Sequence, residues 1–553
     1  MTAWVPGLRR LRGYDRRWLR SDAVAGIVLA AILVPQGMAY AELAGVPAVT
    51  GLYTTIACLV GYALFGPSRV LVLGPDSSIS PLIFAAITPL LVTDDPDEAI
   101  ALAGMLAVLV GLVELGLGMG KLGLVADLLS KEVQVGYMNG LAVTIVVSQL
   151  PKLFGFSVDA DGFGDEVVGF FEGLDAAHTA TLVTGLAVLA VLLILPRFTT
   201  LVPAILVAVI GVTAVSAAIG LADEGVATVG SLPQGVPTPS LPGTNLGDIA
   251  PLLIAAFGIT LVSLADTIAT ATSFAARRGD EVHADQEMIG IGAANITAGF
   301  FQGFAISTSG SRTAVAEQSG AKSQLAMLIG AGLVAALLLF FNSLLSALPQ
   351  TALAAVVIVA AFSLVDVRVL VGAWRVRRSA VMISLAATAG VILLGVLEGI
   401  AVAVVLAILL FFKRNWWPHG AVLGRVEELG GWHSVDQHPA ARELDGIVVY
   451  RWEAPLFFAN AGIFREQIRR LALEREPRWI VLQCEAITDV DLTAASMLKQ
   501  LDLELNEVGI HLAFAEMRSR LQDLTLRYGL LETLDKDHFY LELDDAIRAI
   551  TRD

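Results

Sequence analysis

Residues 73–80 read LGPDSSIS, and residues 305–313 read AISTSGSRT. Both stretches interrupt apolar sequence with small and polar residues, and each precedes a short apolar run instead of a full span. One lies in each half of the hydrophobic part of the chain. Paired interruptions of this kind predict two helices that begin inside a membrane, one in each half of the protein.

A helix that begins at that depth exposes four backbone N–H groups without intrahelical partners, and its dipole places positive potential there. Together these features form an anion site that needs no cation. Such backbone survives only where protein packs around it or where it lines a cavity. Serine and threonine hydroxyls add donors, and Arg312 adds a fixed charge. The alternative is that both stretches are loops at the membrane surface.

The composition places the chain in the membrane class. Its 553 residues are 56% hydrophobic and 16% charged, whereas soluble chains have about 25% charged residues. A membrane-spanning helix needs about 20 apolar residues. About fourteen apolar segments are predicted, at 22–42, 49–65, 77–90, 98–118, 124–150 (with room for two elements), 180–196, 199–221, 249–275, 287–302, 308–318, 324–346, 350–365, 379–395 and 397–413. The segments 77–90 and 308–318 are too short to span alone.

Basic residues indicate how the chain is oriented. Arginines cluster before the first segment, and Lys413 and Arg414 close the last one. Because cytoplasmic loops carry an excess of such residues, we expect both termini to be cytoplasmic in a multi-pass protein of the plasma membrane, the inner membrane in a bacterium. The stretch 231–242 contains four prolines and is predicted to be a loop between two halves.

The composition changes after Trp417, and charges are dense from about residue 430 to 551. Strands are predicted at 446–452, 479–484 and 510–516, and helices at 460–474, 492–506, 518–528 and 543–550. Strands that alternate with helices predict a small α/β domain. The expected domains are a cytoplasmic N-terminal segment (1–20), a transmembrane transport domain (21–415), a linker (416–429) and the α/β domain (430–553).

Several classes of function receive no support. Cys58 lies in an apolar segment and Cys484 in the soluble part, so no disulfide is expected. The histidines show no metal-ligand spacing, and we do not expect a metal between His433 and His438. The net charge of −16 does not favour a nucleic-acid partner. Neither an enzymatic activity nor a cofactor is predicted.

Asp266 lies inside the apolar segment 249–275. A carboxylate at the bilayer centre costs about 2.5–3.5 kcal/mol on insertion scales, so it should face the bundle interior. Thr270 is one turn further on and shares that helix face. A carboxylate and a hydroxyl so placed can ligate Na⁺, or the carboxylate can carry a proton. The alternative is a structural carboxylate bonded to a neighbouring helix.

Gln36 and Tyr40 repeat this spacing in the first segment, where a flanking proline and glycine should loosen the helix. Gln36 offers an amide donor and Tyr40 an aromatic wall, although both can instead make hydrogen bonds between packed helices. Glu42, near the end of the segment, is a candidate for coupling or for the membrane interface. Glu114, near the end of its own segment, is expected to extend toward the interface.

Several motifs resemble one known family. They are RWL at 17–19, VPQGMAYA at 34–41, GLY at 51–53, DQE at 285–287 and SGSRT at 309–313. In this order they resemble the SulP family of anion transporters. In the tail, APLFFANA at 454–461 and DVDLT at 489–493 resemble the STAS domain of that family. The resemblance covers nearly the whole chain.

The resemblance implies two inverted seven-segment repeats, arranged as a core and a gate domain, that work by alternating access and often as a homodimer. It implies an anion site between the third and tenth segments, walled by the first and eighth. By position, the anion contacts are Gln36, Tyr40, Ser77, Ser78, Ile79, Ser309, Ser311 and Arg312. Asp266 stands where coupled members keep an acidic residue, and Thr270 matches a Na⁺-ligand threonine of a bicarbonate-transporting member.

Two positions depart from the family pattern. Some members carry a neutral residue where Asp76 stands, and a carboxylate beside an anion site is electrostatically unfavourable. Asp76 should either point away or cap the half-helix by accepting from the N–H groups of Ser78 or Ile79. In the tail, Thr493 corresponds to a phosphorylatable serine of related domains. A plain helix N-terminus is favoured there over a regulatory site for a cytoplasmic partner.

The leading hypothesis is secondary active transport of a small inorganic anion, sulfate or bicarbonate, coupled to Na⁺ or H⁺ through Asp266. A cation bound there neutralises the carboxylate and favours anion entry. The alternatives are an uncoupled anion channel or exchanger, a C4-dicarboxylate transporter of the same fold, and a signalling receptor with the C-terminal domain as output. The sequence chooses neither the anion nor the coupling ion.

Overall fold

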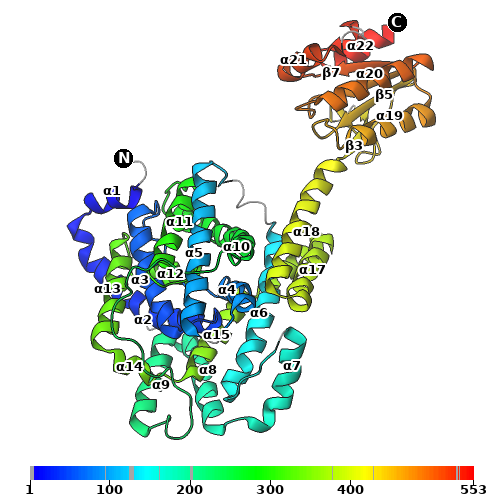
Figure 1. Ribbon diagram of the computed structural model, residues 1–553. Coiled ribbons are helices and arrows are strands. Elements are labelled where there is room, and N and C mark those ends of the chain that lie inside the picture. Colours follow the sequence, from blue (N-terminus) through cyan, green and yellow to red (C-terminus); the bar gives the residue numbers. More distant parts are fainter. Residues whose placement is uncertain are drawn as a thin grey trace. The chain divides into compact units, whose positions relative to one another are not determined.

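The structure is a computed structural model that describes residues 5–93, 95–123, 130–160, 162–199, 203–376, 378–426, 429–530, 534 and 536–552. It divides into two compact units, Met1–Ala407 and Ile408–Asp553. The first unit is helical and the second contains a sheet (Figure 1). Each unit is described by itself below.

The first half of the helical unit contains α1 (Pro6–Arg12), α2 (Leu19–Leu43), α3 (Ala48–Phe65), α4 (Ser80–Ile87), α5 (Pro96–Met119), α6 (Lys131–Phe154), α7 (Phe163–Glu172), α8 (Thr179–Phe198) and α9 (Ala204–Ile219). The second half contains α10 (Ile249–Ala276), α11 (Ala284–Phe300), α12 (Gly310–Gln318), α13 (Leu325–Phe340), α14 (Asn342–Ser346), α15 (Gln350–Leu364), α16 (Val367–Val376), α17 (Arg378–Leu394) and α18 (Val396–Trp416).

Among the described residues, seven helical stretches are long and apolar enough to cross a membrane. They are Arg16–Leu43, Ala48–Phe65, Pro96–Met119, Lys131–Phe154, Thr179–Phe198, Ile249–Ala276 and Gln350–Val376. Shorter apolar helices lie at Ser80–Leu90, Ala204–Ile219, Leu325–Phe340, Arg378–Leu394 and Val396–Leu410. The predicted segments therefore correspond to observed helices, with 324–346 divided into α13 and α14, whereas α1, α7 and α16 were not predicted. Parts of the segments 124–150 and 199–221 lie outside the described residues.

The helices form two bundles that mix both halves of the chain. In the first bundle α11 packs on α5 and α3, α2 packs on α3 and α13, and α10 packs on α5. In the second bundle α6 packs on α15 and α17, and α8 packs on α9 and α15. Figure 1 shows this mixing, because blue helices of the first half lie beside green helices of the second. Contacts of α2 with α15 and α9 join the bundles.

The two interrupted stretches meet inside the first bundle. Strand β1 (Leu73–Gly74) pairs antiparallel with β2 (Ser307–Thr308), with Leu73 opposite Thr308. All four residues are buried, and the short helices α4 and α12 follow these strands. The stretches are thus interior backbone that starts two half-helices. The alternative of loops at the membrane surface is wrong.

Close approach of backbones explains glycines at the helix crossings. A Cβ atom at Gly51 of α3 would lie 1.8 Å from the carbonyl oxygen of Gly37 in α2. A Cβ atom at Gly111 of α5 would lie 2.5 Å from the carbonyl oxygen of Gly292 in α11. Only residues without side chains let these helices pack at this distance.

The second unit is a six-stranded sheet in the order β4-β3-β5-β6-β7-β8. Its strands are β3 (Gly420–Arg425), β4 (Trp432–Ser434), β5 (Ile447–Trp452), β6 (Trp479–Gln483), β7 (His511–Ala515) and β8 (Phe539–Tyr540). Its helices are α19 (Ala461–Arg475), α20 (Leu492–Glu507), α21 (Ser519–Arg527) and α22 (Leu543–Arg552). Strands β5 to β8 are parallel, and β3 is antiparallel to β4 and β5.

Both faces of this sheet are covered. Val448 and Tyr450 of β5 pack with residues of α19, α20 and α21, whereas Val449 packs with residues of α22. The predicted α/β domain is therefore present, with its three predicted strands in parallel. One boundary is corrected, because β3 lies within residues 416–429, which were assigned to a linker. This short strand is defined by pairing with β5, a contact that local sequence does not reveal.

The α2–α3 crossing gives a stability prediction. The substitution Gly51→Ala should destabilise the protein by about 1–3 kcal/mol, because the added methyl group must displace the backbone of Gly37. Gly332→Ala in α13 is the matched control, since nothing lies within 4 Å of a Cβ atom there. Thermal denaturation in detergent should show a lower midpoint for Gly51→Ala alone. Equal midpoints for both variants would refute this account of the crossing.

Candidate functional site

Asp76 organises the start of α4. Its Oδ1 atom accepts from the Ser78 backbone N–H at 3.0 Å and from the Ser78 hydroxyl at 2.8 Å. Its carbonyl oxygen accepts from the Ser80 N–H at 3.0 Å. As predicted, Asp76 accepts from the Ser78 N–H, but it does so in the turn before α4 and is not the cap of that helix, whose N-cap residue is Ile79. The Ile79 N–H instead points to the Asp76 carbonyl oxygen, at 3.4 Å.

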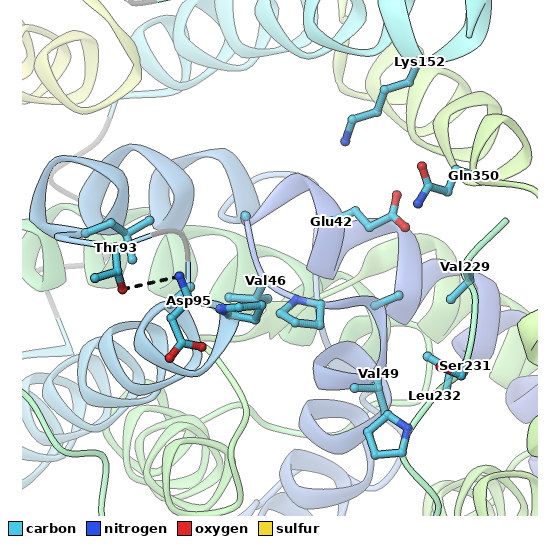
Figure 2. Close-up of a pocket in the computed structure, with 17 residues that line it drawn as sticks. Glu42, Val46, Val49, Thr93, Asp95, Lys152, Val229, Ser231, Leu232 and Gln350 are labelled. Carbon is cyan, nitrogen blue, oxygen red and sulfur yellow. Dashed lines mark hydrogen bonds between the residues drawn. The ribbon is translucent and has the colours of Figure 1, made fainter. Parts of the chain in front are cut away.

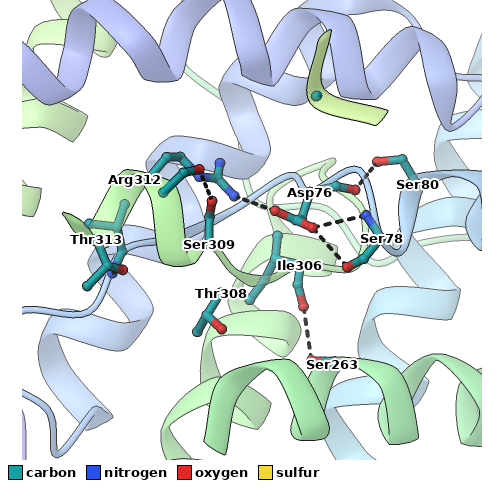
Figure 3. Close-up of polar contacts among 12 residues, drawn as sticks. Asp76, Ser78, Ser80, Ser263, Ile306, Thr308, Ser309, Arg312 and Thr313 are labelled. Atoms are coloured by element: carbon teal, nitrogen blue, oxygen red, sulfur yellow. Dashed lines mark hydrogen bonds and ion pairs between the residues drawn. The ribbon is translucent and has the colours of Figure 1, made fainter. Parts of the chain in front are cut away.

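Arg312, in the first turn of α12, forms an ion pair with Asp76. Its Nη2 atom lies 3.3 Å from Asp76 Oδ2, and its side chain is 1% exposed (Figure 3). Gly74 makes room for it, because a Cβ atom there would lie 2.9 Å from Arg312 Nη1. One ion pair therefore joins two half-helices that are far apart in the sequence.

This ion pair uses only part of the guanidinium group. Among the described residues, Arg312 Nε and Nη1 have no hydrogen-bond partner although both atoms are buried. Buried donors without partners cost about 1–3 kcal/mol each and are rare in native proteins. The two unused donors are suited to bind an oxyanion, which would satisfy their hydrogen bonds.

Hydroxyl groups surround the same point. Ser309 is the N-cap residue of α12, and its Oγ atom lies 3.1 Å from Ser311 Oγ. Thr308 Oγ1 donates to Thr267 Oγ1 of α10 at 3.4 Å. Ser77 is buried beside Asp76. The starts of α4 and α12 thus present serine hydroxyls together with backbone N–H groups.

Helix α2 supplies one wall. Tyr40 is buried, and its hydroxyl lies close enough to Asp76, Arg312 and Ser77 to interact with them. Gln36, one turn earlier, is 8% exposed, and its Oε1 atom has no partner among the described residues. The structure thus places Tyr40 at the ion pair and Gln36 next to it on the same helix.

Asp266 lies on α10 between the two bundles. Its Oδ1 atom accepts from Gln134 Nε2 of α6 at 3.1 Å. The Asp76 carboxylate is near enough to repel the Asp266 carboxylate, and the Ser78 side chain is near enough to stabilise it. Thr270 is one turn further along α10, with Oγ1 3.8 Å from the place of a Cβ atom on Gly310. Both residues therefore lie close to the starts of the half-helices.

Helix α6 brings residues that the sequence analysis missed. The Tyr137 hydroxyl donates to the Ser78 carbonyl oxygen at 3.3 Å, and Gln134 donates to Asp266. Through these two residues the second bundle contacts Ser78 and Asp266 of the first. Polar residues inside the predicted segment 124–150 were the available signal.

Glu114 of α5 was also misread. It is fully buried, and it accepts from the Ser263 hydroxyl at 3.0 Å and from Asn295 Nδ2 at 2.8 Å. Asn295 Oδ1 in turn accepts from the Ile306 N–H at 2.8 Å. The expectation that Glu114 extends to the interface is wrong. It instead holds the strand that leads into α12.

A separate cavity lies at the C-terminal end of α2. Its volume is about 550 Å³, and it is lined by Glu42, Val46 and Asp95 of the first bundle and by Lys152 and Gln350 of the second (Figure 2). It does not include Arg312 or Asp266. Because both bundles line it, the cavity marks where they separate at this end. The coupling role considered for Glu42 stays a prediction.

In the second unit, Thr493 lies at the start of α20. Asp491 is the N-cap residue, and its Oδ1 atom accepts from the Ala494 N–H at 2.8 Å. Its other carboxylate oxygen accepts from the Phe458 N–H at 2.8 Å. Thr493 itself is exposed. This geometry is that of a capped helix N-terminus, as favoured from the sequence.

Comparison with known proteins now identifies the family. Residues 19–387 match the profile of the sulfate permease family, and residues 438–546 match that of the STAS domain. The chain belongs to the sulfate permease family. A protein of Mycobacterium tuberculosis named "Probable sulfate transporter" is 42% identical over 99% of this chain and 98% of its own length. "Solute carrier family 26 member 6" of Homo sapiens is 32% identical over 84% of this chain and 64% of its own length.

Solved structures show the same fold. SLC26A9 superposes with a TM-score of 0.90 at 23% identity, covering 100% of this chain and 93% of that one. The transmembrane domain of the cyanobacterial bicarbonate transporter BicA gives 0.61 at 23% identity, over 71% of this chain and 98% of its own. The predicted SulP fold with a STAS domain is thus confirmed. The protein is a membrane-embedded anion transporter and not an enzyme.

The Glu114 cluster gives a second prediction. Glu114→Ala should lower the stability by about 2–4 kcal/mol, because it leaves a cavity and leaves Ser263 and Asn295 only their longer hydrogen bonds to the Ile306 carbonyl oxygen. Glu114→Gln should retain most of the stability, because its amide can bond to both Ser263 and Asn295. Thermal denaturation of both variants in detergent is the measurement. An Ala variant as stable as the wild type would show that Glu114 does not hold this strand.

Proposed function

We propose that the protein is a secondary active transporter that carries a small inorganic oxyanion across the plasma membrane, sulfate in preference to bicarbonate. The main support is the buried Arg312, whose unpartnered donors lie at the start of two half-helices. The names of relatives favour sulfate, since proteins of Mycobacterium tuberculosis and Arabidopsis thaliana are named sulfate transporters. Bicarbonate is the second candidate because of the fold shared with BicA.

The proposed anion ligands come from α2, from the turn before α4, and from the N-cap residue and first turn of α12. They are Gln36, Tyr40, Ser77, Ser78, Ile79, Ser309, Ser311 and Arg312. The N–H groups of the half-helices and the hydroxyls are neutral donors, so Arg312 supplies the positive charge. Asp76 keeps that charge in place when no anion is bound, because an unpaired buried guanidinium would be costly.

Charge balance gives a reason for coupling. Arg312 carries one positive charge, and Asp76 and Asp266 carry one negative charge each, so the empty site has a net charge of −1. An anion bound at Arg312 and the ionised Asp266 carboxylate would repel each other, because charges inside a protein are screened less than in water. A proton or Na⁺ on Asp266, with Thr270 as a further Na⁺ ligand, removes that repulsion. Anion and cation should therefore bind together.

The hydrogen bond between Gln134 and Asp266 suggests how cation binding at Asp266 can influence the movement of the two bundles. Gln134 belongs to the second bundle and Asp266 to the first. A cation on Asp266 would weaken this bond and favour movement of one bundle against the other. We propose alternating access of this kind, with the cavity beside Glu42 as one entrance. A homodimer with cytoplasmic termini, and a STAS domain that binds a regulator, complete the proposal.

Two alternatives make different predictions. An uncoupled channel or exchanger has no use for Asp266, and electrical recording would reveal a channel by fluxes far above carrier turnover. A C4-dicarboxylate transporter of the same fold would prefer succinate over sulfate in a competition assay. Radiolabelled sulfate uptake into proteoliposomes, with succinate, bicarbonate and chloride as competitors, distinguishes these cases.

Arg312→Gln should weaken sulfate binding by roughly 10- to 100-fold, because charged hydrogen bonds contribute about 1.5–3 kcal/mol. Equilibrium binding to purified protein is the measurement. The exposed Arg470, in the second unit, provides the control Arg470→Gln, which should bind like the wild type.

Loss of folding can be separated from loss of binding. Arg312→Gln alone leaves Asp76 buried without its cation, whereas the double variant Asp76→Asn/Arg312→Gln removes both charges. The double variant should recover stability and still fail to bind sulfate. Wild-type affinity in a folded double variant would exclude Arg312 as an anion ligand.

Asp266→Asn should abolish uptake driven by a Na⁺ or pH gradient, because the amide binds neither cation. Exchange of internal for external sulfate should persist, since the anion ligands remain. Asp248→Asn, at the N-terminus of the same helix α10, is the matched control and should keep coupled uptake. Gradient-driven uptake in Asp266→Asn at the wild-type rate would rule out the coupling role.

A further inference from the structure

Helix α16 (Val367–Val376) has no partner on most of its surface. None of its residues is buried. Val367 is 56% exposed, Val371 is 52% exposed and Trp374 is 50% exposed. Spaced at i, i+4 and i+7, these three form one apolar stripe along the helix. Apolar side chains this exposed on one helix face indicate a contact outside the unit itself.

A second stripe beside the first is basic. Arg368 and Arg375 are exposed and spaced at i and i+7, and the exposed Arg378 follows in the first turn of the next helix, α17. The Arg378 guanidinium lies 5.8 Å from the ring centre of Trp374. None of the ion pairs found among the described residues involves these three arginines. The helix thus presents cations that form no ion pair with a carboxylate among the described residues.

Helix α16 is distinct from the apolar helix before it. Val365 adopts an extended conformation after α15, and the Asp366 carboxylate accepts from the Val369 N–H at 3.2 Å. The Asp366 N–H donates to Asn139 of α6. The chain therefore turns after α15 and starts α16 with a new cap. The apolar stretch of α15 ends where the arginines begin.

The chain path places α16 at the same end of the bundles as the N-terminal arginines. Asp22, at the start of α2, accepts from Ser323, just before α13. Gly26 lies against Ile329, and Leu33 lies near Gly330, so α13 runs parallel to α2. Helix α15 begins at the far end, where the Gln350 N–H donates to the Ala227 carbonyl oxygen. It returns from there, and α16 follows its end.

We propose that α16 lies along the membrane surface at the N-terminal end of the bundles and binds acidic phospholipids there. The stripe of Val367, Val371 and Trp374 faces the acyl boundary, and Arg368, Arg375 and Arg378 bind headgroup phosphates. An amphipathic helix with arginines on its polar face and tryptophan on its apolar face has this preference. Because apolar helices α15 and α17 flank it, α16 is held at the depth of the headgroups.

The proposal has a consequence for the bundle. Helix α6, which carries Gln134, packs on α15 and α17, the helices that α16 connects. Acidic lipid bound at α16 would therefore anchor the second bundle at one membrane face while the first bundle moves. A transport rate that rises with acidic lipid is expected.

The chain suits a test by site-specific labelling. Cys58 and Cys484 are both buried, and burial raises the pKa of the Cys484 thiol to about 12. An introduced Val371→Cys should therefore react selectively with an environment-sensitive thiol dye near neutral pH. Leu503→Cys in α20, where Leu503 is 53% exposed, is the matched control in the second unit.

The labelled full-length chain is reconstituted into phosphatidylcholine vesicles with and without phosphatidylglycerol. At Val371→Cys we expect blue-shifted emission that shifts further with phosphatidylglycerol. The triple variant Arg368→Gln/Arg375→Gln/Arg378→Gln should lose the further shift, and Leu503→Cys should show aqueous emission throughout. Aqueous emission at Val371→Cys would overturn the proposal. Emission independent of phosphatidylglycerol, or dependent on protein density, would also overturn it and indicate protein contact.

An unlabelled measurement covers the case in which the triple variant does not fold. Brominated phosphatidylglycerol should quench the wild-type protein more than Trp374→Phe, because Trp374 lies at the headgroup boundary. Equal quenching of both proteins would contradict the proposed placement of α16. Neither measurement depends on the transported anion or on Asp266, so each can fail while the proposed transport function stands.

Discussion

The buried ion pair between Arg312 and Asp76 connects the first turn of α12 to the turn that leads into α4, and both helices begin inside the first bundle. Each of these starts exposes backbone N–H groups that the membrane would not tolerate alone. Asp76 satisfies the donors of Ser78, and the β1–β2 pair satisfies others. Arg312 balances the carboxylate, yet keeps two nitrogen atoms without partners among the described residues. A stable core and the proposed anion site thus use the same residues.

The polar network behind this pair fixes its geometry. Glu114, Ser263 and Asn295 come from three helices and converge on the backbone of Ile306, just before β2. Gly74 gives the guanidinium its space. On the other side, Tyr137 and Gln134 of α6 contact Ser78 and Asp266. The site is therefore rigid within the first bundle and sensitive to the position of the second, as proposed alternating access requires.

The apolar segments and both half-helices could be predicted because their signals are local. Hydrophobic length identifies α2 or α10, and glycine with serine breaks the pattern before α4 and α12. The ion pair could not be predicted, because 236 positions separate Asp76 from Arg312. Glu114 was misread for a similar reason, since its partners lie on α10 and α11. Strand β3 and helix α16 were missed because both are short. Long-range pairing defines β3, and exposed arginines distinguish α16.

Linkage between anion and cation is the central claim of the proposed mechanism, and equilibrium binding tests it directly. The apparent Kd of radiolabelled sulfate should be measured on the purified wild-type protein across separate series of Na⁺ concentration and pH. If Asp266 couples the two ions, the Kd should fall as one cation is raised, and sulfate should strengthen binding of that cation by the same factor. A Kd that is unchanged across both series would contradict the account.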